Sequence, residues 1–223
     1  MRPRFEAGRS RVCVITDSTL SRGRSHEEVV RAALAGGADH VQLRDKTLSS
    51  RRLYELGLLL RKLTLAHGAL FFVNDRPDIA AAVEADGVHL GAEDLPVDAA
   101  RRLFGRRLLV GASARTVDEA IAAAAAGADY LGLGPVFEAR GSKPDAVPPG
   151  GVELVRAVRA VCRIPILAIG GIHAANVEPV IRAGASGVAV ISAIVAAEHV
   201  SGAAERLRDA VLQARGAEPP AAP

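Results

Sequence analysis

Amide and cationic side chains alternate along one short segment of the chain, Gln42-Leu43-Arg44-Asp45-Lys46. In an extended strand successive side chains point to opposite faces, so Gln42, Arg44 and Lys46 share one face. Two cations and an amide donor on one face suit a polyanion such as pyrophosphate. A structural Arg–Asp pair at the rim of the fold is the alternative, and this segment alone does not decide between them.

Two aspartates follow neighbouring apolar segments of the sequence. Asp75 comes directly after residues 70–74, and Asp94 follows residues 87–90 by a few positions. If both segments are adjacent strands, both carboxylates lie near the two cations, where Mg²⁺ could bind them together with phosphate oxygens. As alternatives, Asp94 could cap the next helix and Asp75 could be a turn residue. Their joint placement beside the cations favours the metal.

Other polar residues also follow apolar segments. Ser113 directly follows the segment 108–112. The Thr116/Glu119 pair forms a capping box and is a better cap for the next helix than Ser113, which leaves Ser113 for the active face. The longest loop covers residues 138–151, where Ser142 and Lys143 could bind an anion. That loop could equally be a mobile linker.

A second anion site is predicted near the end of the chain. Gly170-Gly171 and Ile191-Ser192 follow two consecutive apolar segments, where backbone N–H groups and a helix N-terminus often bind phosphate. His89 lies within a predicted strand and has no evident nucleophile as a partner. We therefore interpret His89 as structural.

A recurring phrase indicates which elements position these residues. Gly37-Ala-Asp, Ala85-Asp-Gly, Gly127-Ala-Asp and Gly184-Ala-Ser each join an alanine-rich stretch to a short apolar segment. Repeated βα units predict a barrel or a doubly wound sheet, and eight of them favour a single-domain α/β fold, the (β/α)8 TIM barrel. The predicted strands are 12–16, 40–43, 70–74, 87–90, 108–112, 130–133, 166–169 and 187–191. The predicted helices lie near 26–36, 49–67, 77–84, 97–104, 116–126, 151–161, 175–183 and 199–214.

Composition narrows the class of protein further. The 223 residues are 49% hydrophobic but only 3% aromatic, and the net charge is +3. Scattered arginines without interleaved aromatics argue against nucleic-acid binding, and the two cysteines give no metal or disulfide pattern. No apolar run is long enough to cross a membrane, so we expect a cytoplasmic protein. We expect an irregular stretch at 1–10, a catalytic barrel at 11–215 and a disordered tail at 216–223.

Taken together, these segments resemble the thiamine-phosphate synthase family over residues 12 to 210. The segments are Gln-Leu-Arg-Asp-Lys (42–46), Val-Asn-Asp-Arg (73–76), Asp-Gly-Val-His-Leu-Gly-Ala-Glu-Asp (86–94), Gly-Ala-Ser (111–113), Gly-Ala-Asp-Tyr-Leu-Gly-Leu-Gly-Pro-Val-Phe (127–137), Ile-Gly-Gly-Ile (169–172) and Val-Ile-Ser-Ala-Ile (190–194). The resemblance implies an enzyme that joins hydroxymethylpyrimidine pyrophosphate to thiazole phosphate. Pyrophosphate would leave in a largely dissociative, Mg²⁺-dependent substitution.

The resemblance also implies a role for each matching residue. The pyrimidine substrate and its pyrophosphate would contact Gln42, Leu43, Arg44, Asp45, Lys46, Asn74, Ser113 and Lys143, and the thiazole phosphate would contact Ser142, Gly171, Ile191 and Ser192. Arg44, Lys46 and Lys143 would be catalytic, and Asp75 and Asp94 would bind Mg²⁺.

One departure from the family pattern lies in the long loop. The family usually carries Thr-x-Thr-Lys there, whereas this chain has Arg140-Gly-Ser-Lys143 and, by our count, one more residue. The alternatives are a thiazole tautomerase paralogue and a non-catalytic barrel that binds thiazole phosphate. The tautomerase typically lacks the two aspartates and has a histidine where Gly134-Pro135 stands here. The sequence also allows a homodimer.

Overall fold

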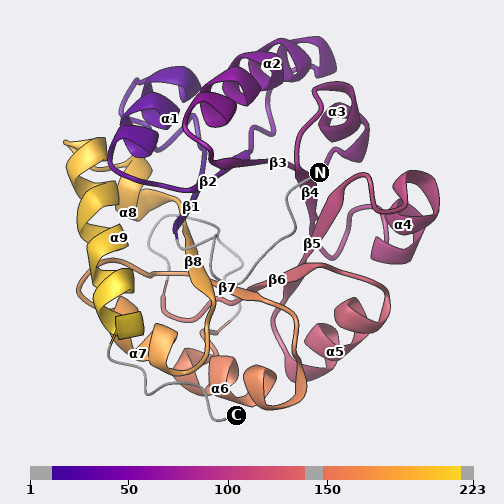
Figure 1. The fold of residues 1–223 in the computed structure, drawn as a ribbon, viewed down its shortest axis with the longest axis vertical. Coiled ribbons are helices and arrows are strands. Elements are labelled where there is room, and N and C mark those ends of the chain that lie inside the picture. The colour runs from indigo at the N-terminus through magenta and orange to yellow at the C-terminus, as the bar shows by residue number, and fades with distance from the viewer. Residues whose placement is uncertain (1–11, 139–147, 217–223) are drawn as a thin grey trace.

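The fold is a closed barrel of eight parallel strands in the order β1 to β8. The computed structural model describes residues 12–138 and 148–216. Viewed along its axis, the sheet forms a ring that helices surround on all sides (Figure 1). The strands are β1 Val12–Ile15, β2 His40–Leu43, β3 Leu70–Asn74, β4 Gly87–Leu90, β5 Leu109–Ala114, β6 Tyr130–Leu133, β7 Ile166–Ile169 and β8 Gly187–Val190. The predicted TIM barrel is thus confirmed.

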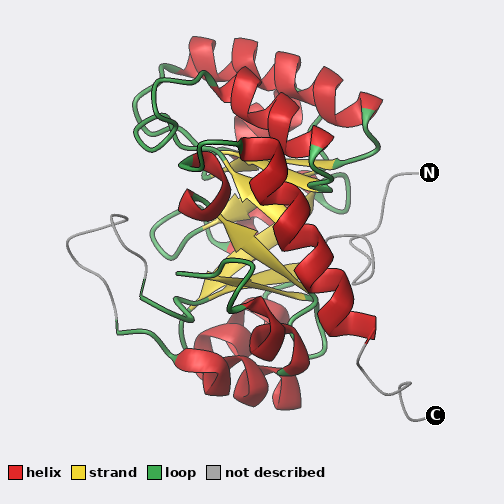
Figure 2. Ribbon diagram, turned by 90° about the vertical axis from the view of Figure 1, so that its left-hand side faces the viewer, coloured by secondary structure: helices red, strands yellow, loops and turns green. Residues whose placement is uncertain are grey.

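Helices connect the strands and form the outer layer, and the loops gather at the two ends of the barrel (Figure 2). Within the described residues the helices are α1 His26–Ala35, α2 Ser50–Ala66, α3 Pro77–Ala82, α4 Val97–Phe104, α5 Val117–Ala125, α6 Gly151–Val161, α7 Val177–Arg182, α8 Ser192–Val195 and α9 Val200–Gly216. The short helix α8 was not predicted from the sequence. The end of β5 was predicted two residues early, because the polar Ser113 looked like the start of a loop.

The hydrophobic core has two layers. Outward-facing strand residues such as Val41, Leu43 and Val73 are buried against the helices. Inward-facing residues such as Cys13, Phe72 and Leu167 form a separate cluster inside the ring. This alternation follows from the period of two along each strand, and it aims the inward side of each strand end at the mouth.

Glycines on the inner face make room for large neighbours. A Cβ on Gly111 would lie 2.1 Å from the Tyr130 ring, and one on Gly132 would lie 2.7 Å from Cε1 of His89. Each ring therefore occupies space inside the barrel where a glycine on another strand has no side chain. The two glycines thus decide where Tyr130 and His89 lie.

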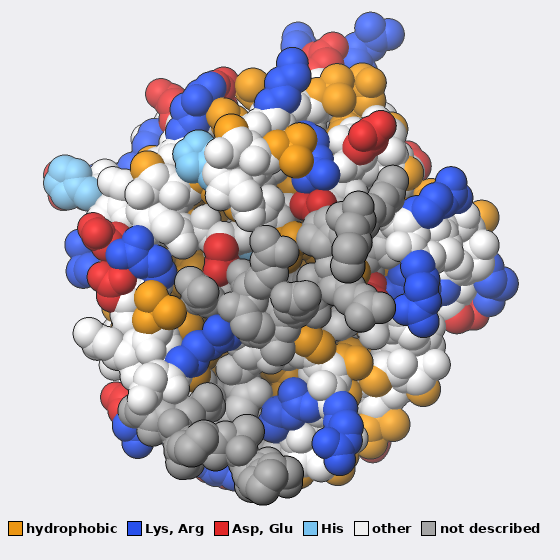
Figure 3. All heavy atoms as spheres, in the orientation of Figure 1, with side chains coloured by type: hydrophobic (Ala, Val, Ile, Leu, Met, Phe, Trp, Pro, Cys, Tyr) orange, Lys and Arg blue, Asp and Glu red, His pale blue; other side chains and the backbone are white. Residues whose placement is uncertain are grey.

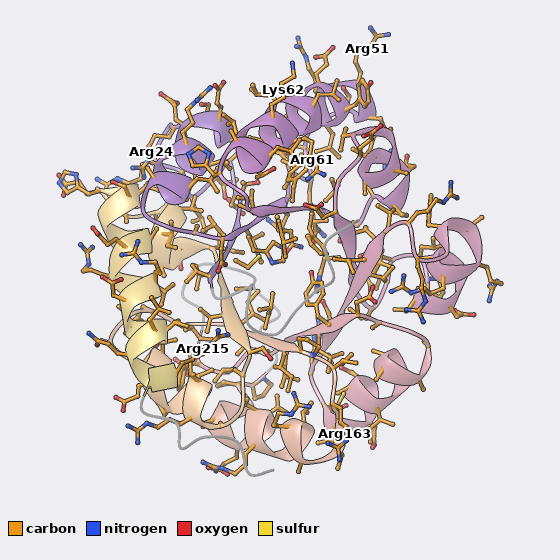
Figure 4. The ribbon with its side chains drawn as sticks, viewed as in Figure 1. Arg24, Arg51, Arg61, Lys62, Arg163 and Arg215 are labelled. Carbon is orange, nitrogen blue, oxygen red and sulfur yellow. The ribbon has the colours of Figure 1, made fainter. Side chains whose placement is uncertain are left out.

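The repeated phrase in the sequence has a structural role at the amino ends of the strands. In each repeat, a side chain just before an even-numbered strand accepts a hydrogen bond from the first residues of the strand before it. These bonds run from Val12 N to Asp39, from Phe71 N to Asp86, from Val110 N to Asp129 and from Ile166 N to Ser186. Arg61 of α2, labelled in Figure 4, also pairs with Asp86 at 2.8 Å, and Arg101 of α4 pairs with Asp129. We call the four acceptors, Asp39, Asp86, Asp129 and Ser186, the strand pins.

Several predictions concern residues at the ends of the chain. Residues 1–11 and 217–223 lie outside the described part, so the expected irregular start and disordered tail stay predictions, although Gly216 belongs to α9. Cys13 and Cys162 are both free and buried. Among the described residues, no helix has the length and apolar character that a membrane crossing requires.

Candidate active site

The two predicted metal ligands lie next to each other at the carboxyl ends of β3 and β4. Asp75 has a positive φ of 64°, a conformation that Asp tolerates better than most residues, and its N–H donates to the His89 carbonyl at 2.8 Å. Asp94 accepts a 2.7 Å hydrogen bond from the Gly91 N–H, which turns its carboxylate back toward the strand ends. The prediction that these two carboxylates converge is therefore met by the geometry.

Without a bound cation, the neighbouring Asp94 carboxylate makes ionisation of Asp75 unfavourable. Burial, a hydrogen bond with Asp94 and repulsion from the Asp94 charge raise the pKa of Asp75 to about 6. The Lys46 ammonium lies 3.7 Å from the Asp75 carboxylate and opposes the rise. No group of three or more His, Cys, Asp or Glu side chains forms a metal site in the part of the chain that the structure describes. A divalent ion here would take two carboxylates and complete its shell with phosphate oxygens and water, which is the usual environment of Mg²⁺.

The cation-bearing segment of β2 reaches the same mouth. Arg44 donates to the Asp17 carboxylate at 2.8 Å and is partly exposed, whereas the Lys46 side chain is 60% exposed. Around the edge of the face seen in Figure 3, Lys and Arg side chains lie mixed with Asp and Glu side chains. Lys46 therefore has the freedom to move toward a bound anion, while Arg44 is held in place.

Below the charged residues, neutral polar groups line one side of the barrel interior and apolar side chains line the other. The Gln42 amide donates to the Asn74 side chain at 2.7 Å, linking β2 to β3. Figure 4 shows side chains projecting into the space that the strands enclose. The cavity at this level measures about 40 Å³ and is lined by Ile15, Gln42, His89, Ser113, Tyr130, Gly132, Leu167, Ile169 and Ala189.

His89 is the residue that sequence reasoning underestimated. Its two ring nitrogens lie 3.1 Å from the Ser113 hydroxyl and 3.0 Å from the Tyr130 hydroxyl. Burial lowers the pKa of His89 to about 4, so at neutral pH the ring is uncharged and one nitrogen donates while the other accepts. The register between β4 and β5 explains the contact with Ser113. His89 pairs with Gly111, and Ser113 is the next inward-facing residue on β5.

Residues at the ends of β7 and β8 form the other side of the mouth. Gly170 and Gly171 have φ values of 100° and 61°, and a Cβ on Gly171 would lie 2.5 Å from the Glu138 carbonyl. Ile191 precedes α8 and Ser192 begins it. Short helices after the last barrel strands commonly offer their N–H groups to phosphate. The missed helix α8 thus strengthens the predicted phosphate site.

The structure corrects part of the predicted substrate-binding set. The Leu43 side chain is fully buried in the layer between strands and helices, because it lies on the outward face of β2. The Asp45 carboxylate accepts hydrogen bonds from its own loop and from His26, so it faces α1. The predicted contacts of these two side chains with the substrate therefore do not fit their positions. Ser142 and Lys143 lie outside the described residues.

The arrangement as a whole can hold two anions side by side. One site combines the acidic pair, Arg44 and Lys46, and the other combines Gly171 with the start of α8. A floor of polar and apolar side chains lies deeper in the barrel. Such a mouth fits the joining of two phosphorylated small molecules.

Comparison with known proteins agrees with this geometry. The sequence profile of the family described as thiamine monophosphate synthase matches residues 12–194. Thiamine-phosphate synthases from Moorella thermoacetica and Chloroflexus aurantiacus are 55% and 54% identical, over 91% and 89% of this chain and 96% and 91% of their own lengths. The solved structure of thiamine phosphate pyrophosphorylase from Pyrococcus furiosus superposes with a TM-score of 0.87 at 42% identity, covering 93% of this chain and 98% of the other. The chain therefore belongs to the thiamine monophosphate synthase family.

Proposed function

We propose that this chain joins hydroxymethylpyrimidine pyrophosphate to thiazole phosphate, releasing pyrophosphate and forming thiamine phosphate. The observation that carries the proposal is the acidic pair Asp75 and Asp94 beside Lys46, at the mouth of a barrel whose relatives at 55% identity are thiamine-phosphate synthases. The reaction transfers a pyrimidinylmethyl group from the pyrophosphate oxygen to the thiazole nitrogen, so the enzyme is an alkyl transferase.

The leaving pyrophosphate gains negative charge as its bond to carbon breaks. Arg44 is already fixed at the rim by Asp17, and Lys46 is free to approach, so both cations stabilise the charge where it develops. Asp75 and Asp94 would hold Mg²⁺, which neutralises charge on phosphate oxygens when bound. Ser142 and Lys143 stay predicted contacts of the phosphorylated substrates.

The two organic rings would meet above the floor of the barrel. The linked amides of Gln42 and Asn74, together with the Ser113 hydroxyl, offer donors and acceptors to the polar edge of the pyrimidine. Gly171 and the start of α8 at Ser192 would hold the thiazole phosphate. With both rings held close together, the lone pair of the thiazole nitrogen attacks the pyrimidine methylene carbon as pyrophosphate leaves. The attacking nitrogen carries no proton, so this step needs no general base.

An assay with both purified substrates, with and without Mg²⁺, tests the proposal. Pyrophosphate release only in the complete mixture with the metal supports it. Conversion of a thiazole carboxylate phosphate in the absence of the pyrimidine would instead indicate the tautomerase, and binding without turnover would indicate a non-catalytic barrel. Asp75→Ala should lower turnover about 100-fold or more, the scale of losing an electrostatic stabiliser. Asp98→Asn, on the exposed face of α4, is the matched control.

Assembly and location belong to the same proposal. A homodimer and a cytoplasmic location stay predictions. Size-exclusion chromatography with light scattering decides the first, and fractionation of cells decides the second.

A further inference from the structure

Two loops at the mouth share the sequence pattern Asp-x-Thr-Leu and the same set of hydrogen bonds. The first, Asp17-Ser-Thr-Leu20, follows β1, and the second, Asp45-Lys-Thr-Leu48, follows β2. In each loop, Oδ1 of the aspartate accepts hydrogen bonds from the N–H and the hydroxyl of the threonine and from the N–H of the leucine. The donor–acceptor distances are 2.9, 2.6 and 3.0 Å in the first loop and 2.8, 2.7 and 3.1 Å in the second.

The consequence is that the second carboxylate oxygen has a fixed direction. Because three donors hold Oδ1, Oδ2 cannot rotate away, and in both loops it meets a nitrogen of another element. Oδ2 of Asp17 accepts from Nη1 of Arg44 at 2.8 Å, and Oδ2 of Asp45 lies 2.9 Å from Nε2 of His26. The second loop therefore joins to α1, whereas the first joins to the cation of the candidate active site.

The backbone of Arg44 is held by the residue next to Asp17. The Thr16 hydroxyl accepts from the Arg44 N–H at 3.0 Å and donates to the Arg44 carbonyl at 3.2 Å. The Thr16 N–H donates to the Gln42 carbonyl at 2.9 Å, which continues the pairing of β1 with β2. Thr16 and Asp17 thus fix Arg44 at both its backbone and its guanidinium.

The environment of this pair indicates a role in geometry. The Arg44 and Asp17 side chains are 24% and 13% exposed, so the pair is largely shielded from solvent and screened little by salt, yet it still reaches the mouth. Both line a cavity of about 210 Å³ between the loops, together with Lys46 and Ile191. Burial acts to raise the pKa of Asp17, but hydrogen bonds from Thr19 and Leu20 and the Arg44 charge lower it below its ordinary value, so Asp17 is ionised at neutral pH.

We infer that Asp17 is a positioning residue, which holds the Arg44 guanidinium in the orientation that binds pyrophosphate. Arg44 is the pyrophosphate ligand only under the proposed function, so the inference rests on it. An arginine presents its donors in a rigid planar fork, so fixing one Nη fixes the direction of the remaining N–H groups. Asp17 itself touches no substrate in this scheme. It lowers the conformational freedom that Arg44 must lose when the anion binds.

Binding of inorganic pyrophosphate with Mg²⁺, measured by calorimetry, tests the inference on the full chain. Asp17→Asn keeps an oxygen for the loop donors but loses the charged acceptor for Arg44, so we expect about 10-fold weaker binding, the scale of one charge-assisted hydrogen bond. Arg44→Ala should weaken binding at least as much. If Asp17 acts through Arg44, the double variant binds no more weakly than Arg44→Ala alone. Asp98→Asn, which breaks an exposed Asp–Arg pair on α4, should bind like the parent protein.

A kinetic arm separates positioning from a general loss of structure. Asp17→Asn should lower kcat about 10-fold while the KM for thiazole phosphate stays unchanged, because that substrate binds at the other side of the mouth. Effects of Asp17→Asn and Arg44→Ala that multiply in the double variant would overturn the inference, as would parental pyrophosphate binding by either single variant. A parent protein that forms no product would refute the proposed function, and the binding arm would still decide the role of Asp17.

Discussion

Replacing Asp94 by asparagine should make the metal-free protein more stable while it disables the metal site. The pKa of Asp75 rises from 3.8 to about 6, which corresponds to about 3 kcal/mol of unfavourable free energy for ionising Asp75 in the folded chain. Burial is the largest cause and persists in the variant, and solvent reaches 26% of the Asp75 side chain. Removing the Asp94 charge should therefore recover only roughly 1 kcal/mol. The asparagine oxygen can still accept the hydrogen bond from Gly91.

The gain depends on pH in a defined direction. Because the folded pKa of Asp75 lies above its unfolded value, the parent protein loses stability as pH rises from about 4 through 6. Near pH 8 Asp75 is ionised and the full gain should be present, raising Tm by about 2–4 °C for a chain of this size. Near pH 5 Asp75 is protonated in the parent, so the difference between the two proteins should shrink.

Thermal unfolding in EDTA and in Mg²⁺ at both pH values provides the measurement. Mg²⁺ at about ten times its dissociation constant should stabilise the parent by about 1.4 kcal/mol near pH 8, and it should stabilise Asp94→Asn much less. Asp98→Asn controls for the same chemical change on an exposed helix. An unchanged or lower Tm for Asp94→Asn in EDTA near pH 8 would refute the reasoning, because it would mean that the two carboxylates do not repel each other.

Three further variants test other parts of the structure. Lys46→Ala should lower kcat about 100-fold in the complete assay, since its exposed ammonium acts on the leaving pyrophosphate; a near-parental rate would remove its assigned role. Gly132→Ala places a Cβ 2.7 Å from the His89 ring, so both turnover and the free energy of unfolding should fall, the latter by about 1–3 kcal/mol. Asp129→Asn removes the charged partner of Arg101 and weakens the acceptor for the Val110 N–H, so denaturant unfolding should show a loss of roughly 2–4 kcal/mol with kcat per folded molecule unchanged.

The sequence predicted the architecture because its periodicity repeats along the whole chain. Each Gly-Ala-Asp phrase marked the end of a helix and the start of a strand, and the strand boundaries mostly agree with the structure. Where boundaries failed, a local signal misled the prediction. Ser113 is polar but lies inside β5, because inward-facing positions near the mouth are polar in this fold. Helix α8 has only four residues, too few for a periodic pattern to show.

The candidate site was predictable wherever strand alternation fixes the direction of a side chain. Alternation correctly brought Arg44 and Lys46 together, and it places Leu43 on the opposite face, where the structure has it. The wrong prediction for Leu43 came from taking the family segment whole. The contact of Asp45 with His26 and those of His89 with Ser113 and Tyr130 could not be predicted, because these partners lie on other helices and strands. Contacts of that kind depend on register between neighbouring elements, which a single sequence does not state.

The strand pins give the two ends of this barrel different jobs. They fasten the amino ends of the odd-numbered strands, whereas the described residues assigned to the reaction lie at the carboxyl ends. Loops at the mouth can then change in length or composition while the hydrogen bonds at the amino ends of the strands stay intact. Changes in the loops at the carboxyl ends of the strands could thus alter substrate specificity, and substitutions at the amino ends could stabilise the barrel without changing the active site.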